Sequence, residues 1–404
     1  MEVLSNDIKK NIQHQAIGML HSACTDYGIL AGVNDQDNYK RIWARDGVLG
    51  GLAGLVLQDE VIIAGLGNTL TTLWNARDKE LGTIPGNVDP FTGKKSFGSL
   101  AGRVDATTWF LIGAAHFIHH TGESDLLDEL KAEISNIFKT LKAWEFNGRG
   151  LMYTPMSGNW ADEYPYHGYL LYDNLLYYWA CKLWGELLED DLLKLKAYDL
   201  KASIQVNFMI NDEYQSKAYH PGLYQRLSKE QPPYFLSGFH PGGAYQNFDA
   251  AGNGLALLLG FYDAESLEHL TKFIHELWED KNLEGLIPAF WPIIQPGDEL
   301  WPSISSNFSY HFKNEPGHFH NGGIWPIWMG WMAMGLRKNG ATTLADKIQN
   351  KYENVLVENQ YDFAEYLDAY HQQSGGQKPL TYSASGHIFS ANNNFETLQT
   401  FCQK

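Results

Sequence analysis

Two acidic clusters that lie far apart in the chain have the residue types needed to break a glycosidic bond. The first is Gly158-Asn159-Trp160-Ala161-Asp162-Glu163, and the second is Phe363-Ala364-Glu365-Tyr366-Leu367-Asp368. Cleavage of such a bond uses two carboxyl groups, of which one protonates the leaving oxygen and the other activates water or attacks the sugar. We therefore predict a carbohydrate-cleaving site with Asp162 as the general acid and Glu365 as the general base.

The sequence leaves alternatives to both assignments. A general acid needs a raised pKa, and we expect the aromatic surroundings and the neighbouring carboxylate to raise the pKa of Asp162. Glu163 is a rival acid because it adjoins Asp162. Either residue could instead cap a turn, and Glu365 could be a surface carboxylate at the end of an outer helix.

Polar and aromatic residues elsewhere are candidates for binding a sugar, and the chain has 13 Trp, 22 Tyr and 20 Phe on which sugar rings can stack. The Arg45-Asp46 pair offers a donor fork beside an acceptor, which suits vicinal hydroxyls, although it could also be an ion pair that caps a helix. Asp105 could be a helix cap or a hydroxyl acceptor, and either His320 or Asn321 is expected to face the sugar. The predicted substrate-binding residues are Trp43, Arg45, Asp46, Asp105, Trp109, Trp160, Glu163, His167, His320, Asn321, Trp325 and Tyr382.

We predict neither a metal ion nor a cofactor. His318 and His320 lie two residues apart, but no HxxxH spacing or matching set of Cys or carboxylate ligands accompanies them. The chain also has no Walker motif, no GxGxxG that opens a βαβ unit and no GxSxG elbow. Nucleotide and acyl chemistry are therefore poorly supported.

The overall composition excludes several classes of partner. The chain has 404 residues, a net charge of −17 and 44% hydrophobic residues. Such an acidic chain disfavours nucleic acid and anionic membranes, and no apolar run approaches the roughly 18 residues of a membrane helix. The N-terminus does not read as a secretory signal, and Cys24, Cys181 and Cys402 form no disulfide or zinc pattern. We expect reduced thiols and a cytoplasmic protein.

A repeated unit predicts the fold. Each unit opens with a Gly- and aromatic-rich segment, continues as a helix that is apolar nearly all round, turns, and ends in an amphipathic helix. The openings recur about 70 residues apart, near residues 104, 172, 248 and 322. An inner ring of apolar helices inside an outer ring of amphipathic helices is an (α/α)6 toroid, or six-hairpin barrel. We predict an all-α chain with one catalytic domain over residues 1–404.

The loops that lead into the inner helices of such a toroid converge on one end. Nearly every motif named above falls on one of these loops, so we expect the motifs to form one site. The long connections at residues 80–102 and 208–247 also suggest function, because long ordered loops in compact domains often have one. In the second connection, Tyr224, Tyr234 and Phe235 are expected to be exposed as a lid or a subunit contact.

With these residues in place, the chain resembles the (α/α)6 inverting glycosidases that act on α-glucosides, most closely the neutral/alkaline invertase family. The glucosidase domain of glycogen-debranching enzymes is similar but more distant. The resemblance rests on Trp160-Ala161-Asp162, Ala364-Glu365-Tyr366-Leu367-Asp368, Phe319-His320-Asn321-Gly322-Gly323-Ile324-Trp325-Pro326 and Arg45-Asp46.

The resemblance implies that Asp162 protonates the leaving oxygen and that Glu365 activates water for inverting hydrolysis of an α-glucosyl bond. Asp162 is followed by Glu163-Tyr164-Pro165, where the invertases carry basic residues. The predicted substrate is therefore sucrose or a similar small saccharide or glucoside.

Two other functions stay open at this point. A sugar epimerase or isomerase on the same toroid would use histidines as acid and base, and His167 with His318 or His320 could serve. A carbohydrate-binding protein without catalysis would bind sugar and leave it unchanged. The expected partner is a small saccharide or glucoside, with no nucleic acid or membrane, and a homo-oligomer is possible.

Overall fold

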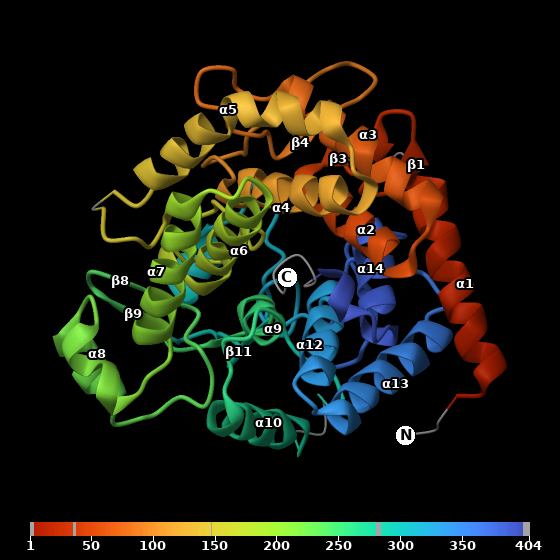
Figure 1. Ribbon diagram of the computed structural model, residues 1–404. Helices are drawn as coiled ribbons and strands as arrows, with labels where there is room; N and C mark the ends of the chain where they lie inside the picture. The colour runs from red at the N-terminus through yellow and green to blue at the C-terminus, as the bar shows by residue number, and fades with distance from the viewer. Residues whose placement is uncertain (1–3, 35–37, 147, 280–282, 284, 399–404) are drawn as a thin grey trace.

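Six helices stand side by side around a common axis in the computed structural model, which describes residues 4–34, 38–146, 148–279, 283 and 285–398. Each packs against the next in chain order, and the last packs back against the first, so the ring closes (Figure 1). The inner helices are α2 (Ala44–Leu57), α4 (Val104–Thr121), α6 (Leu171–Leu187), α9 (Ala250–Leu258), α12 (Pro326–Lys338) and α14 (Thr381–Ala391).

Six outer helices surround this ring. Helix α3 packs on α2, α7 on α6 and α13 on α12, while the first outer helix, α1, packs on the last inner helix, α14. The predicted all-α (α/α)6 fold is confirmed for the described residues. The outer helices are α1 (Asn6–Ala23), α3 (Glu60–Ala76), α5 (Ser124–Ala143), α7 (Asp191–Phe208), α10 (Ala264–Glu279) and α13 (Thr342–Glu358).

The side chains of the two rings explain why the helices take these places. In α5, Leu130, Ile134 and Ile137 are buried on one face and charged residues cover the other, as expected for a helix between core and solvent. Helix α12 is buried from Pro326 to Arg337, so it suits only the interior.

Short antiparallel strands organise the end of the ring at which the inner helices begin. Strands β3, β7 and β10 run directly into α2, α6 and α9, and each pairs with a strand from a neighbouring connection. The strand pairs thereby hold the entry loops at one end. The strands are β1 (Cys24–Thr25), β2 (Gly28–Ile29), β3 (Ile42–Trp43), β4 (Asn87–Val88), β5 (Lys95–Ser96), β6 (Tyr153–Thr154), β7 (Gly168–Leu170), β8 (Gly238–His240), β9 (Gly243–Tyr245), β10 (Phe248–Asp249), β11 (Phe290–Trp291), β12 (Tyr366–Leu367) and β13 (Ser374–Gly375).

The connection at residues 208–247 differs from its prediction. It contains the 3-10 helix η1 (Asp212–Lys217), the short helix α8 (Pro221–Leu227) and strands β8 and β9. Tyr224, Tyr234 and Phe235 are buried, so the expectation that they are exposed is wrong. These rings pack inward because the connection folds onto the toroid, where their apolar surface is removed from water.

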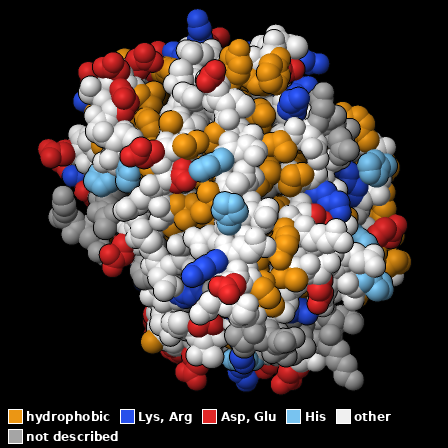
Figure 2. Space-filling model, turned by 90° about the vertical axis from the view of Figure 1, so that its right-hand side faces the viewer, with side chains coloured by type: hydrophobic (Ala, Val, Ile, Leu, Met, Phe, Trp, Pro, Cys, Tyr) orange, Lys and Arg blue, Asp and Glu red, His pale blue; other side chains and the backbone are white. Residues whose placement is uncertain are grey.

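The surface and the cysteines say little about the function of the protein. Acidic, basic and apolar side chains are interspersed on the side that carries α1 and α13 (Figure 2). Within the described residues, no helix combines the length and apolar character needed to cross a membrane. Cys24 and Cys181 are free, and Cys402 lies outside the described residues.

Helices α12 and α14 approach so closely at Gly330 and Gly386 that neither glycine has room for a Cβ atom. We expect Gly386→Ala to lower the free energy of unfolding by about 1–3 kcal/mol through overpacking. The control is Gly18→Ala in the outer helix α1, where a Cβ meets nothing within 4 Å. That change should stabilise the protein by about 1 kcal/mol, since alanine favours helix. Denaturant unfolding of both variants checks the contrast, and equal effects would contradict this account of the ring.

Candidate active site

The structure brings the two acidic clusters to the same end of the ring. Asp162 lies on the loop between β6 and β7, and Glu365 lies directly before β12. The hydroxyl of Tyr39 donates to Oε1 of Glu365 at 2.6 Å. Burial, and then the negative charges of Glu365, Asp46 and Asp162, raise the pKa of this hydroxyl well above its usual value. The three carboxylates therefore share one electrostatic environment.

Glu365 is a buried carboxylate with two uncharged donors. The Tyr39 hydroxyl donates to one oxygen, and the main-chain N–H of Gln377 donates to the other at 3.2 Å. Burial raises the pKa of Glu365 to about 7, against the opposing effect of these hydrogen bonds. A carboxylate with a pKa near neutrality suits a general base. Gly376, at φ +72°, lies against the carboxylate and leaves no space for a Cβ atom.

Asp162 has the opposite electrostatics. Arg103, the residue before α4, forms an ion pair with Oδ2 of Asp162 and donates to the main-chain oxygen of Asn159 at 2.6 Å. Burial raises the pKa of Asp162, but the charge of Arg103 and its hydrogen bond to the carboxylate outweigh burial, and the net shift is downward. The expected rise from aromatic neighbours is therefore wrong for this structure, because Arg103 stabilises the ionised form.

Glu163 faces another segment. Its Oε1 accepts from the N–H of Ser309 at 3.4 Å and lies 3.9 Å from Nζ of Lys313. Its main-chain oxygen accepts from the amide of Asn314 at 2.9 Å. Burial raises the pKa of Glu163. These contacts tie the loop that contains Asp162 to residues 307–314, which follow the short helix α11 (Trp301–Ser306).

Arg45 and Asp105 form an ion pair at the base of the site. Nη1 of Arg45 donates to Oδ2 of Asp105 at 2.9 Å, and Tyr172 donates to the same oxygen at 3.2 Å. Arg45 therefore does not form the alternative capping pair with Asp46, which is itself buried. Trp109 is fully buried, and its indole N–H donates to the Tyr172 hydroxyl at 2.7 Å. Trp109 therefore packs beneath the base of the site and does not line the site.

Aromatic rings surround Trp160 beside these charged groups. The centroids of His320, Trp325 and Trp328 lie 5.2–5.4 Å from that of Trp160. Tyr382 lies against Trp325 and under the guanidinium of Arg45. Candidate residues from four connections thus meet in one cluster.

Four buried polar atoms of this cluster have no hydrogen-bond partner among the described residues. They are Nε of Arg45, Nδ1 of His320, Nε1 of Trp328 and the hydroxyl of Tyr382. A buried unpaired donor or acceptor is costly, and each such group needs an explanation. Burial lowers the pKa of His320 to about 3, so its imidazole is neutral and can bind a hydroxyl. Sugar hydroxyls are suitable partners for all four atoms.

Three predicted binding residues contact other groups. The amide of Asn321 bonds both main-chain atoms of Ile294, at 2.8 and 2.9 Å, and so braces two loops. The ring of His167 bonds Tyr245 at 3.1 Å and stacks on His240, at the β8–β9 hairpin. Trp43 is partly buried and donates to the main-chain oxygen of Asn38 at 3.0 Å.

Sequence reasoning missed Tyr39 and Arg103. Both lie close to a candidate residue in the chain: Tyr39 is six residues before Arg45, and Arg103 is two residues before Asp105. The signal that could have found them is their position in the segments that lead into inner helices. Their partners lie 326 and 59 residues away in the chain, respectively, which the local sequence does not reveal.

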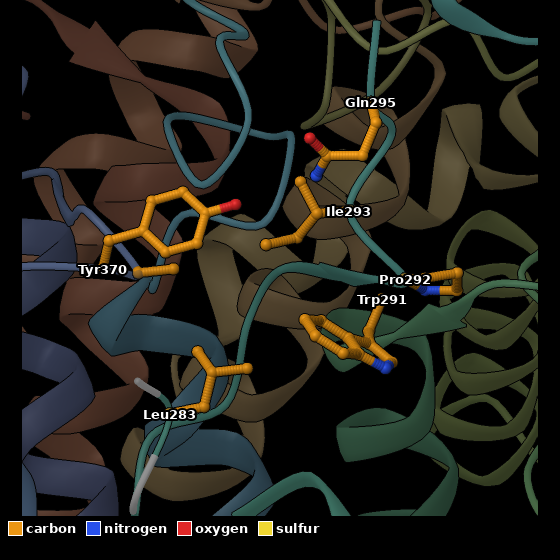
Figure 3. Close-up of a pocket in the computed structure, with 7 residues that line it drawn as sticks. Leu283, Trp291, Pro292, Ile293, Gln295 and Tyr370 are labelled. Carbon is orange, nitrogen blue, oxygen red and sulfur yellow. The ribbon is translucent and has the colours of Figure 1, made fainter. Parts of the chain in front are cut away.

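A cavity lies elsewhere in the molecule. It has a volume of about 200 Å³ and is lined by neither carboxylate of the pair (Figure 3). We place the site by its titratable groups, because bond cleavage needs them and an apolar cavity does not supply them. In the described part of the chain, no group of three or more His, Cys, Asp or Glu residues could hold a metal ion. The cavity is lined by Leu283, Trp291, Pro292, Ile293, Gln295, Ala369 and Tyr370.

Comparison with known proteins finds similarity to glycoside hydrolases. Residues 203–391 match the family described as alkaline and neutral invertase, a family of glycoside hydrolases. The chain is related to the glycoside hydrolases. The match contains Glu365 and the loop with His320, while Asp162 precedes it. The resemblance predicted from the motifs is thus confirmed.

One curated relative and several solved structures extend the comparison. Alkaline/neutral invertase C, mitochondrial, of Arabidopsis thaliana is 26% identical over 149 residues, which are 37% of this chain and only 21% of that protein. The GH63 mannosylglycerate hydrolase from Thermus thermophilus has a TM-score of 0.66 at 14% identity, over 94% of this chain and 100% of that chain. The GH78 rhamnosidase of a Bacillus species has a TM-score of 0.61 at 14% identity, over 95% and 35% of the two chains. These structures support the fold. The cytoplasmic location stays a prediction.

The raised pKa of Glu365 makes stability depend on pH. The pKa of Glu365 rises from 4.5 in the unfolded chain to about 7 in the folded protein. Between these two values the unfolded chain has lost a proton that the folded protein still binds, so the free energy of unfolding falls as pH rises. We expect Glu365→Gln to remove this dependence and to be more stable than wild type at pH 8 by up to about 3 kcal/mol. Denaturant unfolding at pH 4.5 and pH 8 measures the difference. Parallel pH curves for the two proteins would rule out a buried Glu365 with this pKa.

Proposed function

We propose that the chain is an inverting glycoside hydrolase that cleaves an α-glucosyl bond in sucrose or a similar small saccharide or glucoside. One observation carries the proposal. Asp162 and Glu365, 203 positions apart in the chain, both act on the Tyr39 hydroxyl, Glu365 by a hydrogen bond and its charge and Asp162 by its charge. The invertase match supports the class of bond. A mannosylglycerate hydrolase of similar fold has been solved in complex with glucose, which supports a glucosyl ring.

Glu365 is the proposed base. Donation from Tyr39 and from the N–H of Gln377 stabilises its carboxylate, while burial keeps its pKa near 7. In this state it accepts a proton from a water molecule, whose oxygen then bonds to the anomeric carbon. Tyr39 fixes the carboxylate and touches no reacting atom in this scheme.

Asp162 is the proposed acid, and Arg103 controls its proton. In this structure Arg103 stabilises the carboxylate, so Asp162 acquires its proton only when a bound sugar removes water from the loop and raises the pKa. The proton then passes to the glycosidic oxygen as the bond breaks. The epimerase alternative is less well supported, because His320, with a pKa of about 3, is a poor acid at neutral pH.

The stereochemistry of the first product tests the mechanism. Proton NMR of wild type with sucrose should show β-glucose first, because attack from the opposite face inverts the α-configuration. Maltose, isomaltose and trehalose, whose leaving half is also glucose, test which bond is cleaved. Asp162→Asn is the matched variant and should release no glucose on this timescale. Initial α-glucose from sucrose would refute inversion, and failure to cleave any α-glucoside would refute the proposed bond.

A substrate with a good leaving group separates the two roles. α-Glucosyl fluoride needs little acid assistance, so Asp162→Asn should hydrolyse it at a rate near that of wild type while losing about 10²–10⁴-fold on sucrose. Glu365→Gln should lose activity on both substrates.

The reverse pattern would make Glu365 the acid and Asp162 the base. These roles would suit the pKa values in this structure, because that of Glu365 is raised and that of Asp162 is lowered. Glu163→Gln serves as the control, because its contacts are to residues 309–314. It should keep kcat within about threefold of wild type, which a general acid could not.

A further inference from the structure

Asn159 is one of the residues that hold the loop with Asp162, and both its side-chain amide and its main-chain oxygen are hydrogen-bonded. The amide nitrogen of Asn159 donates to Oδ2 of Asp173 at 2.9 Å, and the amide oxygen accepts from the N–H of Ala161 at 3.1 Å. Its main-chain oxygen accepts from Arg103, which also pairs with Asp162. Asn159 thus joins the peptide before Asp162 to the inner ring.

Asp173 anchors this series of hydrogen bonds to an inner helix. It lies in the first turn of α6 and is fully buried. Oδ2 accepts both from Asn159 and from the hydroxyl of Thr154, at 2.8 Å, while Oδ1 has no partner among the described residues. Burial, and then the charges of Asp105 and Asp249, raise the pKa of Asp173 well above its usual value. A neutral carboxyl group fits these contacts.

Packing alone does not fix the loop. A cavity of about 10 Å³, the size of one water molecule, lies beside Asn159 and Trp160 and is bounded on another side by Asp249. A protein interior is otherwise closely packed, so a gap here removes contacts that would hold the loop in place. The hydrogen bonds of Asn159 and Asp173 restrain the loop on this side, while the contacts of Glu163 hold it on the other.

We infer that Asp173 and Asn159 are positioning residues that fix the main chain at Ala161 and so aim Asp162 at the glycosidic oxygen. This inference rests on the proposed function, because it assigns the aimed group the role of acid. Asp173 touches no substrate. It acts through Asn159, and it needs only an acceptor oxygen, not a negative charge.

Substitution at Asp173 tests the need for an acceptor. Asp173→Ala removes the acceptor and should lower kcat by about 100-fold with KM within threefold, since a misplacement of about 1 Å has this effect. Asp173→Asn should restore kcat to within about threefold of wild type, because both hydrogen bonds reach one oxygen that an amide also offers. The control is Thr154→Val, which removes the other donor to that oxygen and should keep kcat. Asn159→Ala provides a second loss variant if Asp173→Ala does not fold.

Hydrogen exchange at the Ala161 amide provides a readout that needs no catalysis. The exchange rate should rise in Asp173→Ala and Asn159→Ala and stay at the wild-type value in Asp173→Asn and Thr154→Val. Faster exchange together with no hydrolysis of any α-glucoside by wild type would support the restraint of the loop and refute the proposed function. Unchanged exchange in Asp173→Ala, or an equal loss of kcat in Asp173→Asn and Asp173→Ala, would overturn the inference.

Discussion

Closure of the inner ring is the constraint on which the rest of the structure depends. The N–H of Thr381 donates to the main-chain oxygen of Ala31 at 3.0 Å, and its hydroxyl donates to that of Leu30 at 2.6 Å. These bonds join the start of α14 to the segment before α2. The same seam brings Tyr39 to Glu365, so the candidate base is complete only when the first and last parts of the chain have met. Folding and the site thus share one long-range step.

The charges at the site are distributed so that its two main carboxyl groups differ. Arg103 pairs with Asp162, Arg45 with Asp105 and Lys313 with Glu163. Within the described residues, Glu365 receives its hydrogen bonds from uncharged groups. The cation lowers the pKa of Asp162, while burial raises that of Glu365 to about 7. Because both groups are carboxyls, their different behaviour comes from their partners.

The sequence predicted the fold better than it predicted the electrostatics. Alternating apolar and amphipathic helices have a local period, so the toroid and the convergence of its entry loops could be inferred from the pattern alone. The pKa of Asp162 could not, because it depends on Arg103, which reaches it from another connection. The role of Asn321 was also hidden, since its amide serves Ile294 on a separate loop. Local sequence shows which residues enter the site region, but not which of them bond to each other.

The beginnings of the inner helices suggest why the site suits a neutral, hydroxyl-rich ligand. Asp46, Asp105 and Asp173 lie in the first turns of α2, α4 and α6, and Asp249 caps α9; all four are buried. The positive end of each helix dipole offsets part of the cost of burying a carboxyl group. These acidic groups accept hydrogen bonds readily, and their mutual repulsion would grow if a further anion entered. A sugar hydroxyl donates to such groups without adding charge, which suits a neutral, hydroxyl-rich ligand at the base of the site.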